Sequence, residues 1–245
     1  MEPFKKPAAS RQRQRGVALL LLLAVVGVGA AAVLISAFSH NTQDQRRSRQ
    51  TMDRMAQAKD ALVGFAATYG RLPRPAISAT DGHESPTPCD SEEACTGFLP
   101  WVSLGVDGAD AWGKLLRYSV TPTYTNAPVL RISAIATKTV QTRFGNGQLA
   151  YLVGHDDCGL AAQCAPVVLI SHGKDNFGFS TQGVFQANAA AGNVDEQLNA
   201  VGSVHFVSRP ISDDPRVAGG VFDDLVTSIP LSFLYSQMAK AHRLP

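Results

Sequence analysis

The sequence predicts an α+β protein in which a long N-terminal helix packs on an antiparallel β-sheet. Three observations predict this class. Residues 17–38 form an apolar run without a charged side chain, residues 42–69 contain no proline, and short apolar or alternating runs separated by turn residues follow. The 21 glycines and 14 prolines also indicate many turns, which argues against a helical bundle.

The apolar run 17–38 is expected to be a transmembrane helix. At about 1.5 Å per residue it would be about 33 Å long, which is enough to cross a hydrocarbon core of about 30 Å. A cleaved secretory signal is the less favoured alternative, because the apolar segment of such a signal is typically only about 7–15 residues long.

The segment before this run, residues 1–16, is polar and basic. Its one acid is Glu2, and its basic residues are Lys5, Lys6, Arg11, Arg13 and Arg15. Arginines also follow the run, so the positive charge on its two sides is nearly balanced. The leader charges lie closer to the run, and all the cysteines lie beyond it. We therefore expect a cytoplasmic N-terminus and a head outside the cytoplasm.

Residues 39–69 are expected to continue the helix, because apolar side chains recur there at helical spacing. Lys59 interrupts this stripe, which consists of Met52, Met55, Ala56, Leu62, Val63 and Ala66. Gly70 and Pro73 then supply stop signals. A membrane anchor followed by a separate amphipathic helix is the alternative. The predicted parts are a leader (1–16), a transmembrane helix (17–38), a helix continuation (39–69) and a globular head (70–245).

The head is expected to begin with a long surface loop, residues 73–97. Alternating or uninterrupted apolar runs predict strands at residues 115–120, 129–136, 149–153, 167–170 and 204–207. Turn residues separate these runs, which favours an antiparallel meander with the run 167–170 as a central strand. The C-terminal stretch is expected to be helical from Asp223 and Asp224, and Pro230 either breaks that helix or starts a second one, whose apolar stripe packs on the head.

The four cysteines form two close pairs, and five residues separate the members of each pair: Cys89 and Cys95, and Cys158 and Cys164. Disulfides are the favoured interpretation, because zinc ligands in such pairs are typically about two to four residues apart. Four cysteines allow three connectivities, and local pairing is the simplest. Disulfides would place the head in an oxidising compartment.

The segment 13–21, in which a basic leader ends at Gly16 and the apolar run begins at Val17, resembles the start of type IV pilins and type II secretion pseudopilins. The resemblance implies that an inner-membrane prepilin peptidase cuts between Gly16 and Val17, and that Val17 is then methylated. It also implies a pilin-like fold, with a single pass through the inner membrane and a periplasmic head. The apolar helix would serve as membrane anchor and as the packing core of a filament.

Two positions depart from the pattern of that family. Val17 stands where phenylalanine or methionine is usual, and Leu21 occupies the fifth mature position, where most pilins carry glutamate. An amine in hydrocarbon needs a paired carboxylate, which Leu21 does not supply. In this respect the chain resembles minor pilins and minor pseudopilins, which sit at or near a filament tip.

Two further patches are similar to pseudopilins. Residues 110–113 (Asp-Ala-Trp-Gly) resemble the point at which those chains enter their sheet, and residues 171–175 (Ser-His-Gly-Lys-Asp) resemble their calcium-binding loop. The second resemblance implies Ser171 and Asp175 as calcium ligands. Because one local acid is a weak site for a hard cation, Asp223 or Asp224 is expected to add charge by folding back. A glycine turn in which Asp175 caps backbone amides is the favoured alternative.

Catalysis is not expected. His155, Asp156 and Asp157 adjoin Cys158, but the sequence has neither a metalloprotease helix motif nor a nucleophile elbow, and its six histidines show no ligand spacing. We therefore predict that the chain is not an enzyme and needs no cofactor, apart from the candidate calcium. A net charge of +2 gives no indication of nucleic acid binding.

The expected function is that of a minor pilin-like or pseudopilin-like subunit of a type II secretion system or type IV pilus. The expected partners are other pilins or pseudopilins, the inner-membrane assembly machinery, prepilin peptidase and the membrane, with no nucleic acid. The alternative is a single-pass, membrane-anchored periplasmic binding protein that does not polymerise, and an anchored enzyme comes third.

Overall fold

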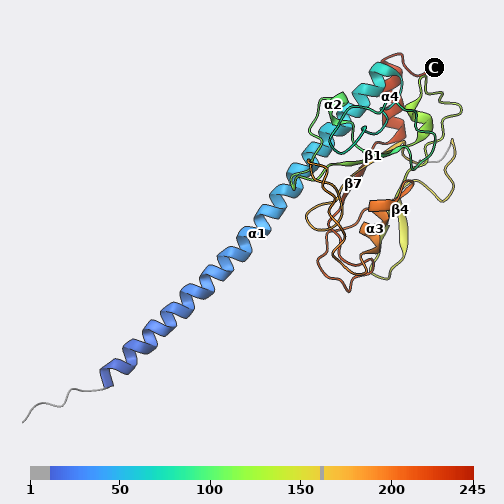
Figure 1. Ribbon diagram of the computed structural model, residues 1–245. Helices are drawn as coiled ribbons and strands as arrows, with labels where there is room; N and C mark the ends of the chain where they lie inside the picture. The colour runs from blue at the N-terminus through green and yellow to red at the C-terminus, as the bar shows by residue number, and fades with distance from the viewer. Residues whose placement is uncertain (1–11, 161–162) are drawn as a thin grey trace, which may run out of the picture. The chain divides into compact units, whose positions relative to one another are not determined.

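The computed structural model describes the backbone of residues 12–160 and 163–245 (Figure 1). It describes the side chains of these residues except 12–18 and 29–41. The chain divides into two compact units, residues 1–46 and residues 47–245. The second unit contains the C-terminal part of the first helix, both β-sheets and the later helices.

Helix α1 (Gln12–Tyr69) buries one stripe of its C-terminal part in the core of the second unit. Met55, Ala58, Leu62 and Ala66 recur every three or four residues, and each is at most 2% exposed. The sequence predicted this stripe with Met52 and Ala56 as members, but both are exposed and Ala58 is buried instead.

The predicted end of this helix is confirmed. Gly70 follows the last helical residue, Tyr69, and adopts a φ of 70°, a left-handed conformation that suits glycine. Its N–H donates to the carbonyl oxygen of Ala66 at 2.9 Å, so the last turn is closed by a backbone hydrogen bond.

The main sheet has four strands, all antiparallel, in the order β1 (Thr96–Phe98), β2 (Arg117–Val120), β5 (Val167–Ser171), β7 (Leu225–Ser228). Every residue of β5 is buried. Its Val167 and Leu169 face the core that contains α1, while Val168 and Ile170 face a second cluster with Phe206. A strand covered on both faces explains the uninterrupted apolar run from which a central strand was predicted.

The second sheet has the order β4 (Leu149–Val153), β3 (Thr139–Arg143), β6 (His205–Val207), and β3 pairs with β6 in parallel. The α+β class with an antiparallel main sheet is therefore confirmed, and the meander is wrong. Strand β2 pairs with β5 and not with β3, the next strand in the sequence. Strands β3 and β4 form a hairpin that belongs to the second sheet.

Two predicted elements near the core are wrong. Residues 129–136 form no strand and contain a turn at 131–133. The N–H groups of Ser133 and Ala134 donate to the carbonyl oxygen of Leu130, and Ile132 is 83% exposed. The helix expected from Asp223 is the edge strand β7. Pairing with β5 makes this segment a strand, and nothing in its own short sequence indicates that it will pair with β5.

The remaining helices are short: α2 (Trp101–Leu104), the 3₁₀ helix η1 (Pro122–Thr125), α3 (Val194–Val201) and α4 (Leu231–Lys240). Pro230 precedes the first residue of α4, as one of the two expectations for it stated. Leu234 and Met238 of α4 are fully buried, which confirms that this stripe packs on the core.

The predicted transmembrane helix falls partly outside the description, because the side chains of residues 17, 18 and 29–38 are not described. Between Leu19 and Val28 the leucine and valine side chains are 58–72% exposed. Among the side chains that are described, no helix offers an apolar stretch long enough to cross a membrane.

Candidate functional site

The candidate site is a polar network around the loop that follows β5, residues 172–176. It begins at Asp110, whose carboxylate is 1% exposed and accepts hydrogen bonds from the N–H groups of Trp112 and Lys114, both at 2.9 Å. The hydroxyl of Ser171, at the end of β5, donates to the same carboxylate at 2.7 Å. The structure thus brings together the two sequence patches 110–113 and 171–175. Burial raises the pKa of Asp110, and these hydrogen bonds partly offset the increase.

The turn that carries Asp110 is fixed to helix α1. Arg54 of α1 donates to the carbonyl oxygens of Ala109 and Asp110, both at 2.9 Å. The N–H of Ala111 donates to the hydroxyl of Thr51 at 3.0 Å. Two side chains of α1 therefore position the edge of the candidate site.

The loop after β5 closes over the ammonium of Lys114. This ammonium donates to the carbonyl oxygens of His172 at 3.2 Å and Asn176 at 3.1 Å, and the residue is 5% exposed. Burial lowers the pKa of Lys114, and the carboxylates of Asp223, Asp110, Asp224 and Asp175 oppose this decrease. A side-chain cation therefore holds two carbonyl groups of the loop.

Three carboxylates converge beside the loop. One oxygen from each of Glu196, Asp223 and Asp224 lies within 4.8 Å of the others. The first is held by the side-chain amides of Asn176 and Asn193, at 2.9 and 2.6 Å. Helix α3 supplies Glu196, and the segment before β7 supplies the two aspartates.

Asp224 is hydrogen-bonded on both oxygens, whereas Asp223 is not. Asp224 lies 3.2 Å from Nδ1 of His172 and accepts from the amide of Asn199 at 2.8 Å. Oδ2 of Asp223 accepts from the N–H groups of Lys174 and Asp175, at 2.6 and 2.9 Å. Its Oδ1 is buried without a hydrogen-bond partner among the described residues.

Burial raises the pKa of Asp223 from 3.8 to about 7, and the neighbouring carboxylates Glu196 and Asp224 add to the increase. The folded state therefore binds the proton of Asp223 more tightly than the unfolded state does. The stabilisation from this proton is complete below about pH 4 and is lost as the pH rises to about 7.

Replacing Asp223 by asparagine is expected to remove this pH dependence. The amide oxygen can still accept from the two loop N–H groups, and its NH₂ can donate to Glu196 or Asp224. We expect the free energy of unfolding of the variant to exceed that of the wild type by about 2 kcal/mol at pH 8 and to equal it at pH 4. This value is roughly half of what the full pKa shift would give, because the side chain is partly exposed. Urea unfolding of the full chain in detergent measures this, with Asp60→Asn on an exposed part of α1 as control. An equal difference at both pH values would contradict it.

The calcium prediction does not fit the described loop. Ser171 is fully buried and its hydroxyl is committed to Asp110, whereas Asp175 is exposed. The carbonyl groups of His172 and Asn176 are occupied by Lys114. The alternative, a glycine turn with capped amides, describes the geometry, but the capping carboxylate is Asp223 and not Asp175.

The cysteines pair locally, as the simplest prediction stated. Cys89 is bonded to Cys95 and Cys158 to Cys164, with Cα–Cα distances of 5.1 and 5.9 Å. Because all four sulfur atoms are in disulfides, the zinc interpretation is wrong.

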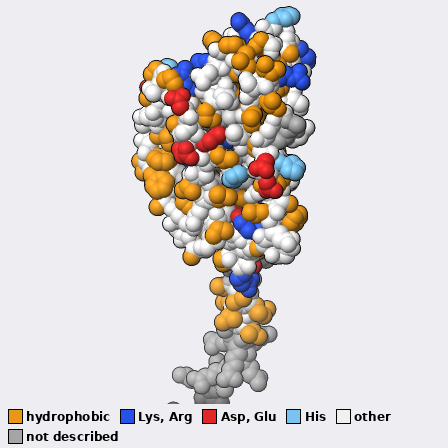
Figure 2. All heavy atoms as spheres, turned by 90° about the vertical axis from the view of Figure 1, so that its right-hand side faces the viewer, with side chains coloured by type: hydrophobic (Ala, Val, Ile, Leu, Met, Phe, Trp, Pro, Cys, Tyr) orange, Lys and Arg blue, Asp and Glu red, His pale blue; other side chains and the backbone are white. Residues whose placement is uncertain are grey.

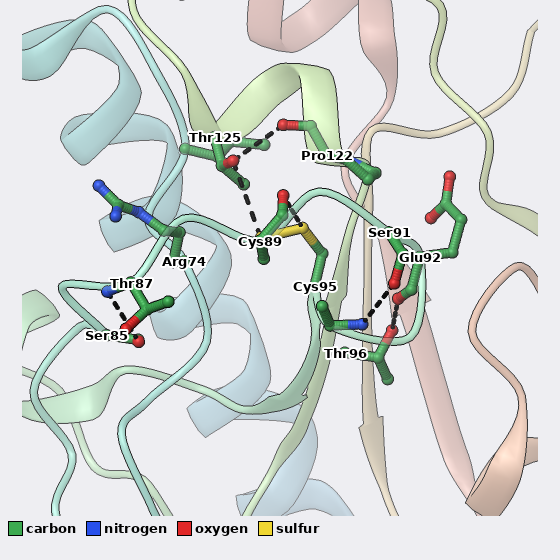
Figure 3. Close-up of a disulfide and its surroundings, with 12 residues drawn as sticks. Arg74, Ser85, Thr87, Cys89, Ser91, Glu92, Cys95, Thr96, Pro122 and Thr125 are labelled. Atoms are coloured by element: carbon green, nitrogen blue, oxygen red, sulfur yellow. Dashed lines mark hydrogen bonds between the residues drawn. A yellow bond between two sulfur atoms is a disulfide. The ribbon is translucent and has the colours of Figure 1, made fainter.

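The first disulfide lies against η1 in the core (Figure 3). Hydrogen bonds within its loop join Ala94 to Ser91 and Thr96 to Glu92, and they lead directly into β1. The disulfide therefore anchors the long loop 73–97 at the point where the sheet begins.

The other residues considered for chemistry lie apart. His155 is exposed and its ring stacks on Tyr151, whose hydroxyl donates to Asp156 at 2.8 Å. His172 is buried beside Asp224. The predicted cleavage and methylation residues, Gly16 and Val17, lie outside the described side chains.

The sequence did not indicate the roles of three residues in the network. These are Asp110, which accepts a hydrogen bond from Ser171, Lys114, whose ammonium binds the loop carbonyls, and Glu196. Asp110 had been singled out only by resemblance. Lys114 follows the Asp-Ala-Trp-Gly patch directly, and a lysine within an otherwise apolar strand approach is the signal that could have identified it.

Comparison of the chain with family models, with curated proteins and with solved structures finds no match.

Proposed function

We propose that this chain is a minor pilin-like or pseudopilin-like subunit of a type II secretion system or type IV pilus, anchored in the inner membrane with a periplasmic head. The observation that carries the proposal is the division of apolar surface along α1. Its C-terminal stripe is buried in the second unit, whereas the leucines and valines between Leu19 and Val28 are 58–72% exposed. Apolar surface of this kind requires lipid or other helices as its surroundings.

Two further features support the proposal. An α+β unit in which a long helix covers one face of an antiparallel sheet agrees with the fold that the leader sequence implies. Two disulfides suit an oxidising compartment such as the periplasm. On the face that Figure 2 shows, apolar side chains are dispersed among polar ones, which suits an exposed head.

The mechanism of such a subunit is mechanical. Prepilin peptidase would remove residues 1–16, the apolar part of α1 would pack among the helices of other pilins or pseudopilins, and the head would present its loops to partners. Leu21 leaves the new N-terminal amine without a carboxylate from its own chain, which suits a minor position.

Mass spectrometry of the protein from its native membrane tests this proposal. We expect N-methylated Val17 as the first residue, and we expect the variant Gly16→Leu to retain the leader, because a bulky side chain then precedes the cleavage point. An intact Met1 in the wild type, or a cut beyond residue 38, would remove the filament proposal and leave the membrane-anchored binding protein as the explanation.

A further inference from the structure

The outer edges of β1 and β6 are each covered by another part of the chain. The N–H of Ala76 donates to the carbonyl oxygen of Phe98 at 2.9 Å and so covers β1. Asn199 covers β6 with its side chain, which accepts from the N–H of Val207 at 2.7 Å and donates to the carbonyl oxygen of Val207 at 2.8 Å. Such protection is the rule, because an open edge invites pairing with another chain.

Strand β7 differs from β1 and β6, because the outward backbone groups of Val226 and Ser228 have no such cover. The N–H of Ile229 donates to the carbonyl oxygen of Val167 at 3.3 Å, which sets the alternation of the antiparallel ladder. In that alternation Leu225 and Thr227 bond to β5, so Val226 and Ser228 direct their N–H and C=O groups away from the sheet. Among the described residues, no backbone hydrogen bond reaches these outward groups.

This edge opens into a groove of about 380 Å³. Helix α1 forms one wall with Met52, Met55, Ala56 and Lys59, and the segment after β6 forms the other. The volume lies within the range of about 300–1,000 Å³ that is usual for binding pockets. The groove therefore combines an apolar wall with the outward backbone groups of Val226, and Ser228 continues the same strand edge beyond the groove lining.

The groove favours a negatively charged group on its ligand. Lys59 lies on its wall, and its ammonium donates to the neutral hydroxyl of Thr227 at 3.2 Å. The other two charged residues of the groove are held elsewhere, since Arg209 is paired with Asp195 and Asp224 with His172 and Asn199. A ligand with a carboxylate near Lys59 would complement this wall.

We propose that β7 accepts an extended segment of a partner protein as an added antiparallel or parallel strand, with apolar side chains against Met52 and Ala56 and an acidic side chain beside Lys59. Unpaired N–H and C=O groups at strand spacing specify an extended backbone as the occupant. This inference stands independently of the proposed function, because it uses only contacts within residues 47–245.

The test uses linear heptapeptides displayed on phage, selected on the full chain in detergent, and then synthesised. The matched variants are Ser228→Pro, which removes the outward N–H and fills the edge with its ring, and Ser228→Ala, which keeps the N–H. Proline is tolerated at an edge position whose N–H faces away from the sheet, so the β5 ladder is preserved. We expect selected peptides to alternate apolar residues around an acid, to bind wild type and Ser228→Ala equally, and to bind Ser228→Pro about tenfold more weakly.

Hydrogen exchange of the wild-type chain gives an answer that does not depend on how Ser228→Pro folds. We expect the amides of Val226 and Ser228 to exchange rapidly in the free chain and slowly with peptide bound. The proposal is overturned if these amides are already protected in the free chain, if no peptide is selected, or if the selected peptides bind Ser228→Pro as tightly as the wild type. Self-association of the wild type that Ser228→Pro abolishes would make a second copy the occupant and would also overturn it.

Discussion

Replacing Asp195 by alanine is expected to lower the free energy of unfolding by about 3–5 kcal/mol. The Asp195 side chain is fully buried in the first turn of α3, and it pairs with Arg143 at 2.7 Å and Arg209 at 2.8 Å. Arg209 is only 4% exposed, so alanine would leave a guanidinium buried without its anion. The arginines lie on β3 and just after β6, so the variant also loses one of the links between α3 and the second sheet.

The control for this prediction lies nearby in the sequence. Asp214 pairs with Arg216 at 3.0 Å, but their side chains are 42% and 88% exposed. Water replaces such a pair at almost no cost, so Asp214→Ala is expected to leave the unfolding midpoint in urea unchanged. Comparable losses for the two variants would show that the burial of Asp195 is not what makes it important.

Replacing Lys114 by methionine is expected to have an effect of similar size, about 3–5 kcal/mol. Methionine matches the length of the stem but leaves the carbonyl groups of His172 and Asn176 without a donor. It also removes the positive charge that faces the carboxylates of Asp110, Asp223 and Asp224. Thermal unfolding of the full chain in detergent measures the loss, and Lys240→Met in the exposed last turn of α4 is the matched control.

Calcium provides the second arm of the same experiment. Because the ammonium of Lys114 occupies the two loop carbonyls, millimolar calcium is expected to leave the Tm of the wild type unchanged. A rise in Tm with calcium, reversed by a chelator, would contradict this assignment and would favour a cation among Glu196, Asp223 and Asp224.

The parts of the fold that local patterns determine could be predicted. The run 167–170 indicated a central strand because burial on both faces requires apolar side chains at every position. Gly70 indicated the end of α1 because a left-handed residue terminates the helical ladder. The five-residue gap within each cysteine pair favoured disulfides over zinc, and the structure has the local pairing that was the simplest of the three connectivities.

The parts that depend on distant partners could not be predicted. Leu225 to Ser228 form a strand because they pair with the free edge of β5, which lies more than 50 residues earlier in the sequence. The side chain of Lys114 reaches residues 58 and 62 positions away in sequence, and no local pattern records such a contact. The carboxylate cluster likewise joins α3 to the approach of β7, so Glu196 showed no relation to Asp223 and Asp224 in the sequence.

The burial of Met55, Ala58, Leu62 and Ala66 has a mechanical consequence. These side chains lie in the largest cluster of the core, together with residues of β2, β5 and α4. Displacement of the C-terminal part of α1 along its axis would therefore shear the contacts of that cluster. Extraction of this part of α1 would remove four buried side chains from the core, so it would be coupled to unfolding of the second unit.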